Sequence, residues 1–323
     1  LASTLQADER KERNTMSTKT SASSADRGES LQRLELLPPG PGNPRNSEGD
    51  FIQLRDGRLL LVYTHFTGAR KDHASAHLSA RFSSDGGMTW TEEDELVLRN
   101  EGGMNVMSVS LLRLPDDRIA LFYGRKNSLQ DCRPLMRLSA DEARSWSEPI
   151  EIIPDEEVGY YVLNNDRVVQ LRDGRLIVPV SRHNAPSWQK WTKYGNQMCY
   201  LSDDNGQSWG RSGTVLTGKR PDGGRVLLQE PGVVELKDGR LMMFCRTDEG
   251  CQYVSYSEDR GNTWSAAVPS NIASPRSPAS IERIPSTGDL MLVWNDHRHV
   301  PAVLKGKRTP LTVAVSKDEG RTW

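Results

Sequence analysis

The sequence predicts an all-β fold built from repeated units, and three observations support this prediction. A turn motif that ends in tryptophan recurs five times, and a second turn motif recurs in phase with it. No stretch longer than one or two turns shows the 3.6-residue apolar periodicity of a helix. The length of 323 residues allows one large all-β domain or two ordinary domains.

The first motif reads Ser-x-Asp-x-Gly-x-Thr-Trp, and its tryptophans are 56, 63, 55 and 59 residues apart. This interval suits one four-stranded blade of a β-propeller with its loops. The Ser, Thr and Asp side chains can bond nearby amides, the Gly permits the reversal, and the Trp fills space between strands. We therefore assign the motif a structural role. Its copies are 83–90 (SSDGGMTW), 139–146 (SADEARSW), 202–209 (SDDNGQSW), 257–264 (SEDRGNTW) and 316–323 (SKDEGRTW).

The second motif is an Asp-Gly turn between apolar runs, which suits a type I′ hairpin because Gly tolerates positive φ. Each repeat is therefore predicted to run strand, Asp-Gly turn, strand, variable loop, strand, tryptophan motif and strand. The turn occurs at 54–59, 171–176 and 236–241, with related turns at 114–119 and 284–290.

The first 35 residues are polar and lack an apolar centre, which predicts a disordered tail rather than a signal peptide or membrane anchor. Residues 36–323 are predicted to form the repeat domain. The sequence begins with Leu, so Met16 is a plausible true start, and a protein starting there would be cytoplasmic. No apolar run approaches the roughly 18 residues that span a bilayer, so we expect no membrane insertion.

Charge and cysteine content exclude further classes of function. The formal net charge of −1 argues against nucleic acid as a partner. The four cysteines lack the spacing of a zinc site, and we expect neither a metal nor a cofactor. Cys245 and Cys251 could face each other across a hairpin, but reduced thiols are the favoured state.

Five such motifs, known as Asp-boxes, resemble the BNR repeats of the sialidase (neuraminidase) superfamily, as in glycoside hydrolase family 33. This resemblance implies a six-bladed β-propeller and an exo-α-sialidase that releases terminal sialic (nonulosonic) acid from glycoconjugates with retention. Because the chain stops at Trp323, at the end of the fifth motif, we expect the last blade to be missing. The resemblance also implies three arginines for the substrate carboxylate, an acid/base Asp, and a Tyr nucleophile activated by a Glu. We expect that Tyr to lie beyond residue 323.

Two of the implied residues fall in one hairpin. Glu230 opens a predicted strand and Arg246 closes the next one, so the two should be neighbours at one rim. The resemblance makes Glu230 the activating Glu and Arg246 a carboxylate-binding Arg, since a guanidinium can bind a carboxylate through two N–H groups. A rim salt bridge without catalytic function is the alternative.

The remaining assignments also follow from the resemblance. Arg308, which precedes the strand of the last motif, matches the third arginine; a solvated basic loop is its alternative. Arg45 is the candidate for the first arginine, although Asn-Ser stands where the family has Ile-Pro. Asp72 matches the acid/base Asp, although Arg70, Lys71 and His73 beside it would oppose the raised pKa that a leaving-group acid needs.

Two other functions remain open from the sequence. One is a propeller glycosidase or lyase that acts on another acidic sugar, such as a uronic acid, which the altered region around Arg45 favours. The other is a non-catalytic glycan-binding propeller, because Asp-boxes also occur in binding proteins.

Overall fold

The five predicted repeats form five groups of antiparallel strands in a computed structural model that describes residues 33–220 and 222–323. Each complete repeat has the predicted order, with the Asp-Gly turn between its first two strands and the tryptophan motif after its third. The all-β prediction is thus confirmed, while the number of six blades stays a prediction. Repeat 1 comprises β1 (Arg45–Gln53), β2 (Leu59–Phe66), β3 (Ala76–Ser83) and β4 (Glu95–Leu98). Repeat 2 comprises β5 (Asn105–Arg113), β6 (Ile119–Lys126), β7 (Cys132–Ser139) and β8 (Ile150–Glu151).

The later repeats follow the same scheme. Repeat 3 comprises β10 (Val169–Gln170), β11 (Leu176–Asn184), β12 (Asn196–Ser202) and β13 (Gly210–Arg211). Repeat 4 comprises β16 (Gln229–Glu235), β17 (Leu241–Arg246), β18 (Cys251–Ser257) and β19 (Val268–Ala273). Repeat 5 comprises β20 (Ser280–Arg283), β21 (Leu290–Asn295) and β22 (Leu311–Ser316).

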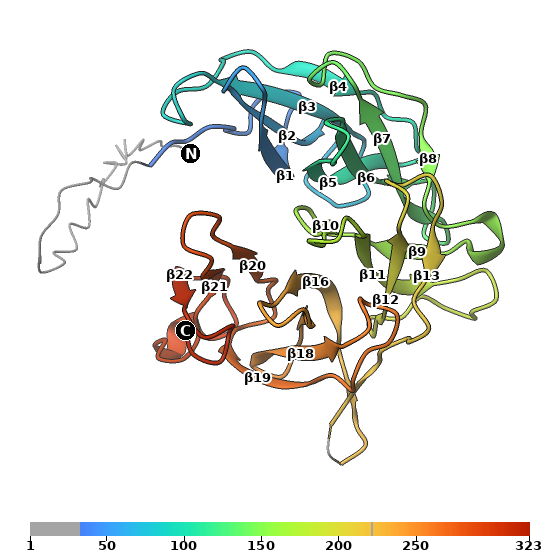
Figure 1. Cartoon of the computed structure of the whole chain (residues 1–323), viewed down its shortest axis with the longest axis vertical. Coiled ribbons are helices and arrows are strands. Elements are labelled where there is room, and N and C mark those ends of the chain that lie inside the picture. The colour runs from blue at the N-terminus through green and yellow to red at the C-terminus, as the bar shows by residue number, and fades with distance from the viewer. Residues whose placement is uncertain (1–32, 221) are drawn as a thin grey trace, which may run out of the picture. The chain divides into compact units, whose positions relative to one another are not determined.

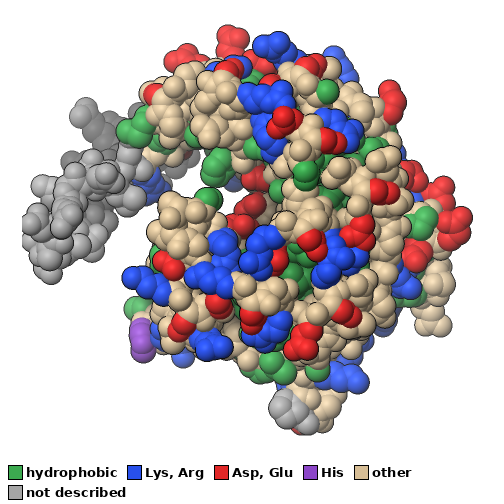
Figure 2. Space-filling model, in the orientation of Figure 1, with side chains coloured by type: hydrophobic (Ala, Val, Ile, Leu, Met, Phe, Trp, Pro, Cys, Tyr) green, Lys and Arg blue, Asp and Glu red, His purple; other side chains and the backbone are tan. Residues whose placement is uncertain are grey.

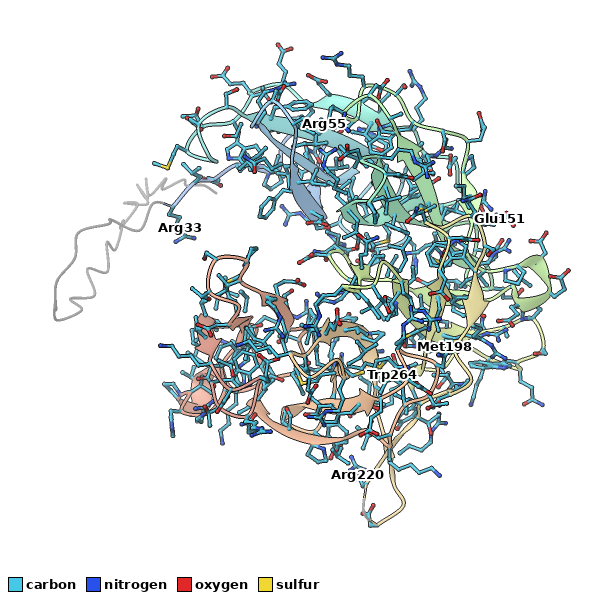
Figure 3. The ribbon with its side chains drawn as sticks, viewed as in Figure 1. Arg33, Arg55, Glu151, Met198, Arg220 and Trp264 are labelled. Carbon is cyan, nitrogen blue, oxygen red and sulfur yellow. The ribbon has the colours of Figure 1, made fainter. Side chains whose placement is uncertain are left out.

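Two features lie outside the predicted scheme. The strand β9 (Tyr160–Val162) pairs with β11 and meets β7 at Cys132, so repeats 2 and 3 share one nine-stranded sheet. The short strands β14 (Gly218–Lys219) and β15 (Arg225–Val226) form a hairpin before repeat 4, and its Arg220 projects at the edge of the view in Figure 3. Two single-turn 3₁₀ helices occupy Asp155–Glu157 and Ala302–Leu304.

Within residues 37–323 the repeats lie around a common centre (Figure 1). The first strand of each repeat is nearest the centre, and the last strand is at the periphery. A gap separates repeat 1 from repeat 5 in this view. The ends of five first strands are therefore brought to one central region.

Apolar residues fill the space between consecutive repeats because side chains alternate between the two faces of each strand. On β6, Ile119 and Leu121 pack toward repeat 1, whereas Ala120 and Phe122 pack toward repeat 3. The motif Trp264 is buried in the cluster between repeats 3 and 4 (Figure 3). Each pair of consecutive repeats is thus held by a main core of its own. A small cluster of Phe66, Ala76 and Met107 also joins repeats 1 and 2.

The tryptophan motifs are closed by hydrogen bonds within the motif, as predicted. In the first copy the Gly87 N–H donates to Ser83 Oγ, and the Thr89 N–H and hydroxyl donate to the two Asp85 oxygens. The second copy keeps these bonds although Ala143 replaces the glycine, and Ala143 has a φ of 67°. The motif carboxylates are therefore used inside their turns.

Repeats 1 and 5 each present an apolar face that the described residues do not cover. On β22, Leu311 and Val313 are 75% and 60% exposed. On β1, Phe51 is 63% exposed. The opposite face of repeat 5 is packed, with Leu292 fully buried.

Three further sequence predictions concern the N-terminal tail, the cysteines and membrane-spanning segments. The predicted tail of residues 1–35 lies, apart from its last three residues, outside the described residues. All four cysteines are free thiols, and Cys245 faces Tyr253 rather than Cys251 across its hairpin. Neither 3₁₀ helix, nor any other helix in the described part of the chain, has the length and apolarity to cross a bilayer.

Candidate functional site

A cavity of about 580 Å³ opens where the inner strands converge. Figure 2 shows acidic side chains in the hollow at the centre of the molecule, with basic side chains beside them. Its charged lining comes from three repeats and comprises Glu48, Asp72, Lys126, Glu230 and Arg246. Its apolar and aromatic lining includes Met107, Leu129, Tyr160, Tyr161, Leu163 and Trp191. Charged groups from separate parts of the sequence therefore share one cavity.

Three cavity residues occupy the same kind of backbone position. Glu48, Ser108 and Glu230 have φ values of 54°, 66° and 51°, in the left-handed region that non-glycine residues rarely adopt. Each lies where the pairing of the first and second strands of its repeat shifts register, that is, in a β-bulge. A bulge re-aims a side chain, and such strained positions concentrate at functional sites.

Packing fixes two of these bulges. A Cβ atom at Gly49, next to Glu48, would lie 2.8 Å from both Tyr63 Cβ and Val62 O. A Cβ atom at Gly232 would lie 2.3 Å from the Phe244 ring. Only glycine fits at either position, so the glutamates before them are held at the cavity wall.

Glu230 and Arg246 are neighbours, as the hairpin argument predicted. The first residue of β16 pairs with Arg246, the last residue of β17. Arg246 Nη1 donates to Glu230 Oε1 in an ion pair whose side chains are only 11% and 17% exposed. Burial lowers the pKa of Arg246 despite Glu230, and the charges of Arg308 and Arg276 lower it further.

Arg45 and Asp72 also form an ion pair, with 2.5 Å between Nη1 and Oδ1. The second Arg45 nitrogen, Nη2, donates to Glu48 Oε1 at 3.2 Å, so one guanidinium serves two carboxyl groups. Arg45 also lies over the Phe66 ring and does not line the cavity, whereas Asp72 and Glu48 do. Arg45 thus supports the cavity wall from behind.

The pKa values of the two carboxyl groups that bind Arg45 are shifted in opposite directions. Burial raises the pKa of Asp72, but the hydrogen bond and charge of Arg45 and the charges of Lys126 and His73 outweigh it, so the net shift is downward. Burial raises the pKa of Glu48, and Ser108 and Arg45 only partly oppose this rise. The raised pKa required of a leaving-group acid is therefore found at Glu48 and not at Asp72 in the free cavity.

The loop that carries Asp72 is held by repeat 2. Lys126, which is 2% exposed, donates from Nζ to the Asp72 main-chain oxygen at 2.7 Å. The Asn105 amide donates to the same oxygen and to Ala74 O. Repeat 2 therefore fixes the position of the loop in repeat 1.

Part of the cavity lining is aromatic. Trp191 is 42% exposed and stacks on the buried His183 ring, with 5.1 Å between ring centroids. His183 is fixed by Ser181 Oγ and Thr192 O, and burial lowers its pKa. Burial also raises the pKa of Tyr160, whose ring is approached by Lys126. An exposed flat ring at a polar cavity suits the apolar face of a sugar.

Arg308 lies in the loop between β21 and β22 and is exposed. It does not line the cavity, but its charge acts on Arg246. Of the five residues proposed from the sequence, Asp72, Glu230 and Arg246 thus reach the cavity, and Arg45 and Arg308 stand behind or beside it. No group of three or more His, Cys, Asp or Glu side chains able to hold a metal occurs in residues 33–220 and 222–323.

Sequence reasoning missed Glu48, Lys126, Tyr160 and Trp191. For Glu48 a signal was present, because Glu48, Ser108 and Glu230 each precede the leucine of their hairpin turn by the same six positions. Trp191 is in a loop, and Lys126 and Tyr160 are at strand ends that only long-range contacts bring to the cavity, so no local pattern marks these three residues.

Comparison with known proteins places the chain in a family. Residues 66–323 of this all-β repeat protein match the model of the BNR repeat-like domain. The chain belongs to the BNR repeat-like domain family, within the sialidase-like BNR repeat superfamily.

Individual relatives are more distant. The chain is 25% identical to the anhydrosialidase of Macrobdella decora over 262 residues, or 73% of this chain and 32% of that protein. It therefore spans about a third of this curated relative. The Hadza microbial sialidase Hz136 has a similar fold, with a TM-score of 0.70, 19% identity, and coverage of 87% of this chain and 58% of that one. A protein of unknown function from Dyadobacter fermentans also has a similar fold, with a TM-score of 0.67 and 18% identity. The match covers 88% of this chain and 82% of that one.

Proposed function

We propose that the chain is an exo-acting, retaining glycosidase that releases a terminal sialic or related nonulosonic acid from glycoconjugates. The observation that carries the proposal is the buried Glu230–Arg246 pair. Among the described residues, Glu230 Oε2 and Arg246 Nε have no hydrogen-bond partner. Leaving such buried groups unpaired costs about 1–3 kcal/mol each. A sugar that supplies both a carboxylate and a hydroxyl would satisfy both groups.

Positive charge near Arg246 favours an acidic sugar. Arg308 and Arg276 do not line the cavity, but the charges of both act on Arg246, so Arg246 lies in a positive field. Guanidinium groups stay charged and match the planar carboxylate. In this proposal Arg246 binds the substrate carboxylate and Arg308 strengthens the field.

Proton transfer to the leaving oxygen is assigned to the carboxyl pair on Arg45. The family resemblance implies Asp72, and Glu48 is the second candidate because the same guanidinium holds it. A substrate carboxylate drawn toward Arg45 would compete for that guanidinium and add negative charge. Both effects would raise the pKa of the carboxyl groups there.

The proposal includes a six-bladed β-propeller and a tyrosine nucleophile. The strands β1 and β22 lie on either side of the gap in Figure 1. They carry the exposed Phe51 and Val313, and a further blade in the gap would cover both faces. In the scheme implied by the resemblance, Glu230 activates a tyrosine that follows residue 323. The sialidase named above supports only the fold part of this proposal, through its similar structure.

The test compares cleavage with binding. Glu230→Gln should abolish hydrolysis of an aryl sialoside, with a loss of about 10²-fold or more in kcat, while sialic acid still binds in calorimetry. Glu235→Gln is the matched control, since Glu235 is on the same strand but pairs with Arg172 outside the cavity. Binding without cleavage by the unmodified protein would instead identify a glycan-binding protein.

A second acidic sugar is also supported by one observation. Arg45 is already occupied by Asp72 and Glu48, so the clamp lacks a free guanidinium at that position. A uronic acid, whose carboxylate is on a different carbon from that of sialic acid, would need no contact there. Cleavage of aryl uronides without cleavage of aryl sialosides would establish this alternative.

A further inference from the structure

The loop between β11 and β12, residues 185–195, borders the cavity. Its Trp191 lines the cavity, is 42% exposed, and stacks on the buried His183 ring. Gln229, which also lines the cavity, donates from Nε2 to Lys193 O at 3.0 Å. The loop sequence APSWQKWTKYG contains two lysines and no Asp or Glu. An aromatic and basic segment is therefore fixed at this edge of the cavity.

Two cations contact the residue that follows Lys193 in this loop. Lys193 Nζ lies 5.0 Å from the centroid of the Tyr194 ring, and Arg225 Cζ, at the hairpin of β14 and β15, lies 4.4 Å from it. Both cationic residues are exposed. Their charges are within roughly 10 Å of each other, about one Debye length in 0.1 M salt, so they repel each other. Contact with an aromatic ring favours each cation and holds both in place.

The carboxylates of the adjacent segments are engaged elsewhere. Glu249 forms an ion pair with Arg220, and the side chains of Asp222 and Asp248 accept hydrogen bonds from main-chain N–H groups. Among the residues whose placement is described, no carboxylate forms an ion pair with either cation that contacts Tyr194. The positive charge at this edge of the cavity is thus not compensated by the protein itself.

The place of these cations fits the part of a substrate that stays outside the cavity. A volume of about 580 Å³ is of the size that holds one small ligand. An exo-acting glycosidase encloses the terminal sugar, so the rest of the glycan leaves across the edge of the cavity. Lys193 and Arg225 are exposed and are not among the residues that line the cavity, whereas Trp191 does line it. The loop thus passes from the enclosed sugar to the solvent.

We infer that Trp191, Lys193 and Arg225 form a subsite for a second negatively charged group of the substrate, separate from the group that Arg246 binds. The inference rests on the proposed glycosidase function and narrows its substrate class. The preferred substrate is a glycan in which the sugar next to the released one carries a sulfate or a carboxylate. The indole ring suits the apolar face of that sugar, and the two cations suit its anionic group. An anion between the cations would also relieve their repulsion.

The experiment compares three glycans that differ in the sugar next to the released sialic acid. That sugar is neutral galactose in sialyllactose, 6-O-sulfated galactose in its sulfated form, and a second sialic acid in disialyllactose. The unmodified protein should cleave at least one of the two anionic glycans with a kcat/KM about three- to tenfold above that for sialyllactose, as expected for exposed ion pairs. A preference for one of them identifies sulfate or carboxylate as the group that is bound.

Charge removal and salt test the origin of this preference. In the double variant Lys193→Gln and Arg225→Gln, the ratio of kcat/KM between anionic and neutral glycan should fall to about one. Arg144→Gln is the matched control, because it removes an exposed arginine from the second tryptophan motif, and it should keep the ratio. Raising NaCl from about 0.02 to 0.5 M should reduce the ratio of the unmodified protein and not that of the double variant.

The outcomes separate the subsite from the glycosidase function. A ratio near one in the unmodified protein, or a preference that persists in the double variant, would overturn the subsite and leave the glycosidase function intact. Calorimetry on Glu230→Gln, which should bind without cleaving, measures the same preference as a ratio of Kd values. If the unmodified protein cleaved none of the three glycans, the glycosidase function would fail, and the Kd ratio would still decide the subsite. Absence of binding to all three would overturn both.

Discussion

Lys126 and Asp72 are joined across two repeats, with 2.7 Å between the lysine Nζ and the aspartate main-chain oxygen. The contact ties the loop that borders the cavity to a buried ammonium group on β6. The charged wall is therefore a composite of two repeats, and its geometry depends on their packing.

Removing this contact should loosen the loop. In Lys126→Met, amide hydrogen exchange over residues 67–75 should accelerate by about tenfold or more, because a hydrogen bond to a charged group contributes about 1.5–3 kcal/mol. Lys190→Met, an exposed substitution, is the control. Unchanged exchange in that loop would show that Asn105 alone suffices to hold it.

The second tryptophan motif contains a correctable strain. Ala143 adopts a φ of 67° where the first copy has Gly87 at 91°. Ala143→Gly should raise the free energy of unfolding by about 0.5–1 kcal/mol, because glycine adopts this conformation without steric cost. Gly87→Ala should lower it by about 1 kcal/mol, because an alanine is strained at this positive φ. The added Cβ would meet Leu59 at an ordinary 3.6 Å, so no clash adds to this cost. Chemical denaturation tests both, and shifts of the same sign would refute the explanation.

Stability should fall from pH 4.5 toward pH 8 because of Glu282. Burial and the Asp166 charge raise its pKa from 4.5 to about 8. Within that window the folded protein holds a proton that the unfolded chain has released, so rising pH favours unfolding. Glu282→Gln should therefore be more stable than the parent at pH 8 by at least ~1.4 kcal/mol, the equivalent of one pKa unit.

The same variant should match the parent near pH 4, where both states of the parent are protonated. The exposed Glu258→Gln is the control. The measurement is chemical denaturation at about pH 4 and pH 8. If the free energy of unfolding changed by the same amount between these pH values in Glu282→Gln and in Glu258→Gln, Glu282 would not be the origin of the pH dependence.

An added charge should affect stability little on one face of repeat 5 and strongly on the other. Val313→Lys should change the stability of the 323-residue chain by no more than about 0.5 kcal/mol and reduce self-association in sedimentation, because Val313 is 60% exposed. Leu292→Lys places a charge in the core between repeats 4 and 5 and should cost about 3 kcal/mol or more. Equal losses would mean that the β22 face is covered.

Local patterns predicted the repeats because their hydrogen bonds are local. The bonds from Gly87 to Ser83 and from Thr89 to Asp85 each span four residues, so the motif's own residues determine the conformation of its turn. The Glu230–Arg246 contact was also predictable, because strand ends in a hairpin meet. In both cases a single turn brings the contacting residues together, so a local sequence pattern is enough to predict the contact.

The rest of the site depends on contacts that no single turn encodes. Glu48 reaches the cavity because Gly49 packs against Tyr63, and Lys126 because repeat 2 closes over the loop of repeat 1. Arg45 was assigned to the substrate from its position along the chain, but its guanidinium is taken by Asp72 and Glu48. Which partner an arginine takes is decided by three-dimensional competition among carboxylates.

The shared bulge has a consequence for how such a cavity can change. Glu48, Ser108 and Glu230 lie at the register shifts between first and second strands, where the ladder is interrupted. An exchange of side chain there alters what the cavity offers to a ligand without removing a rung from any sheet. New ligand preferences can therefore be acquired one repeat at a time, on a scaffold that never has to be rebuilt.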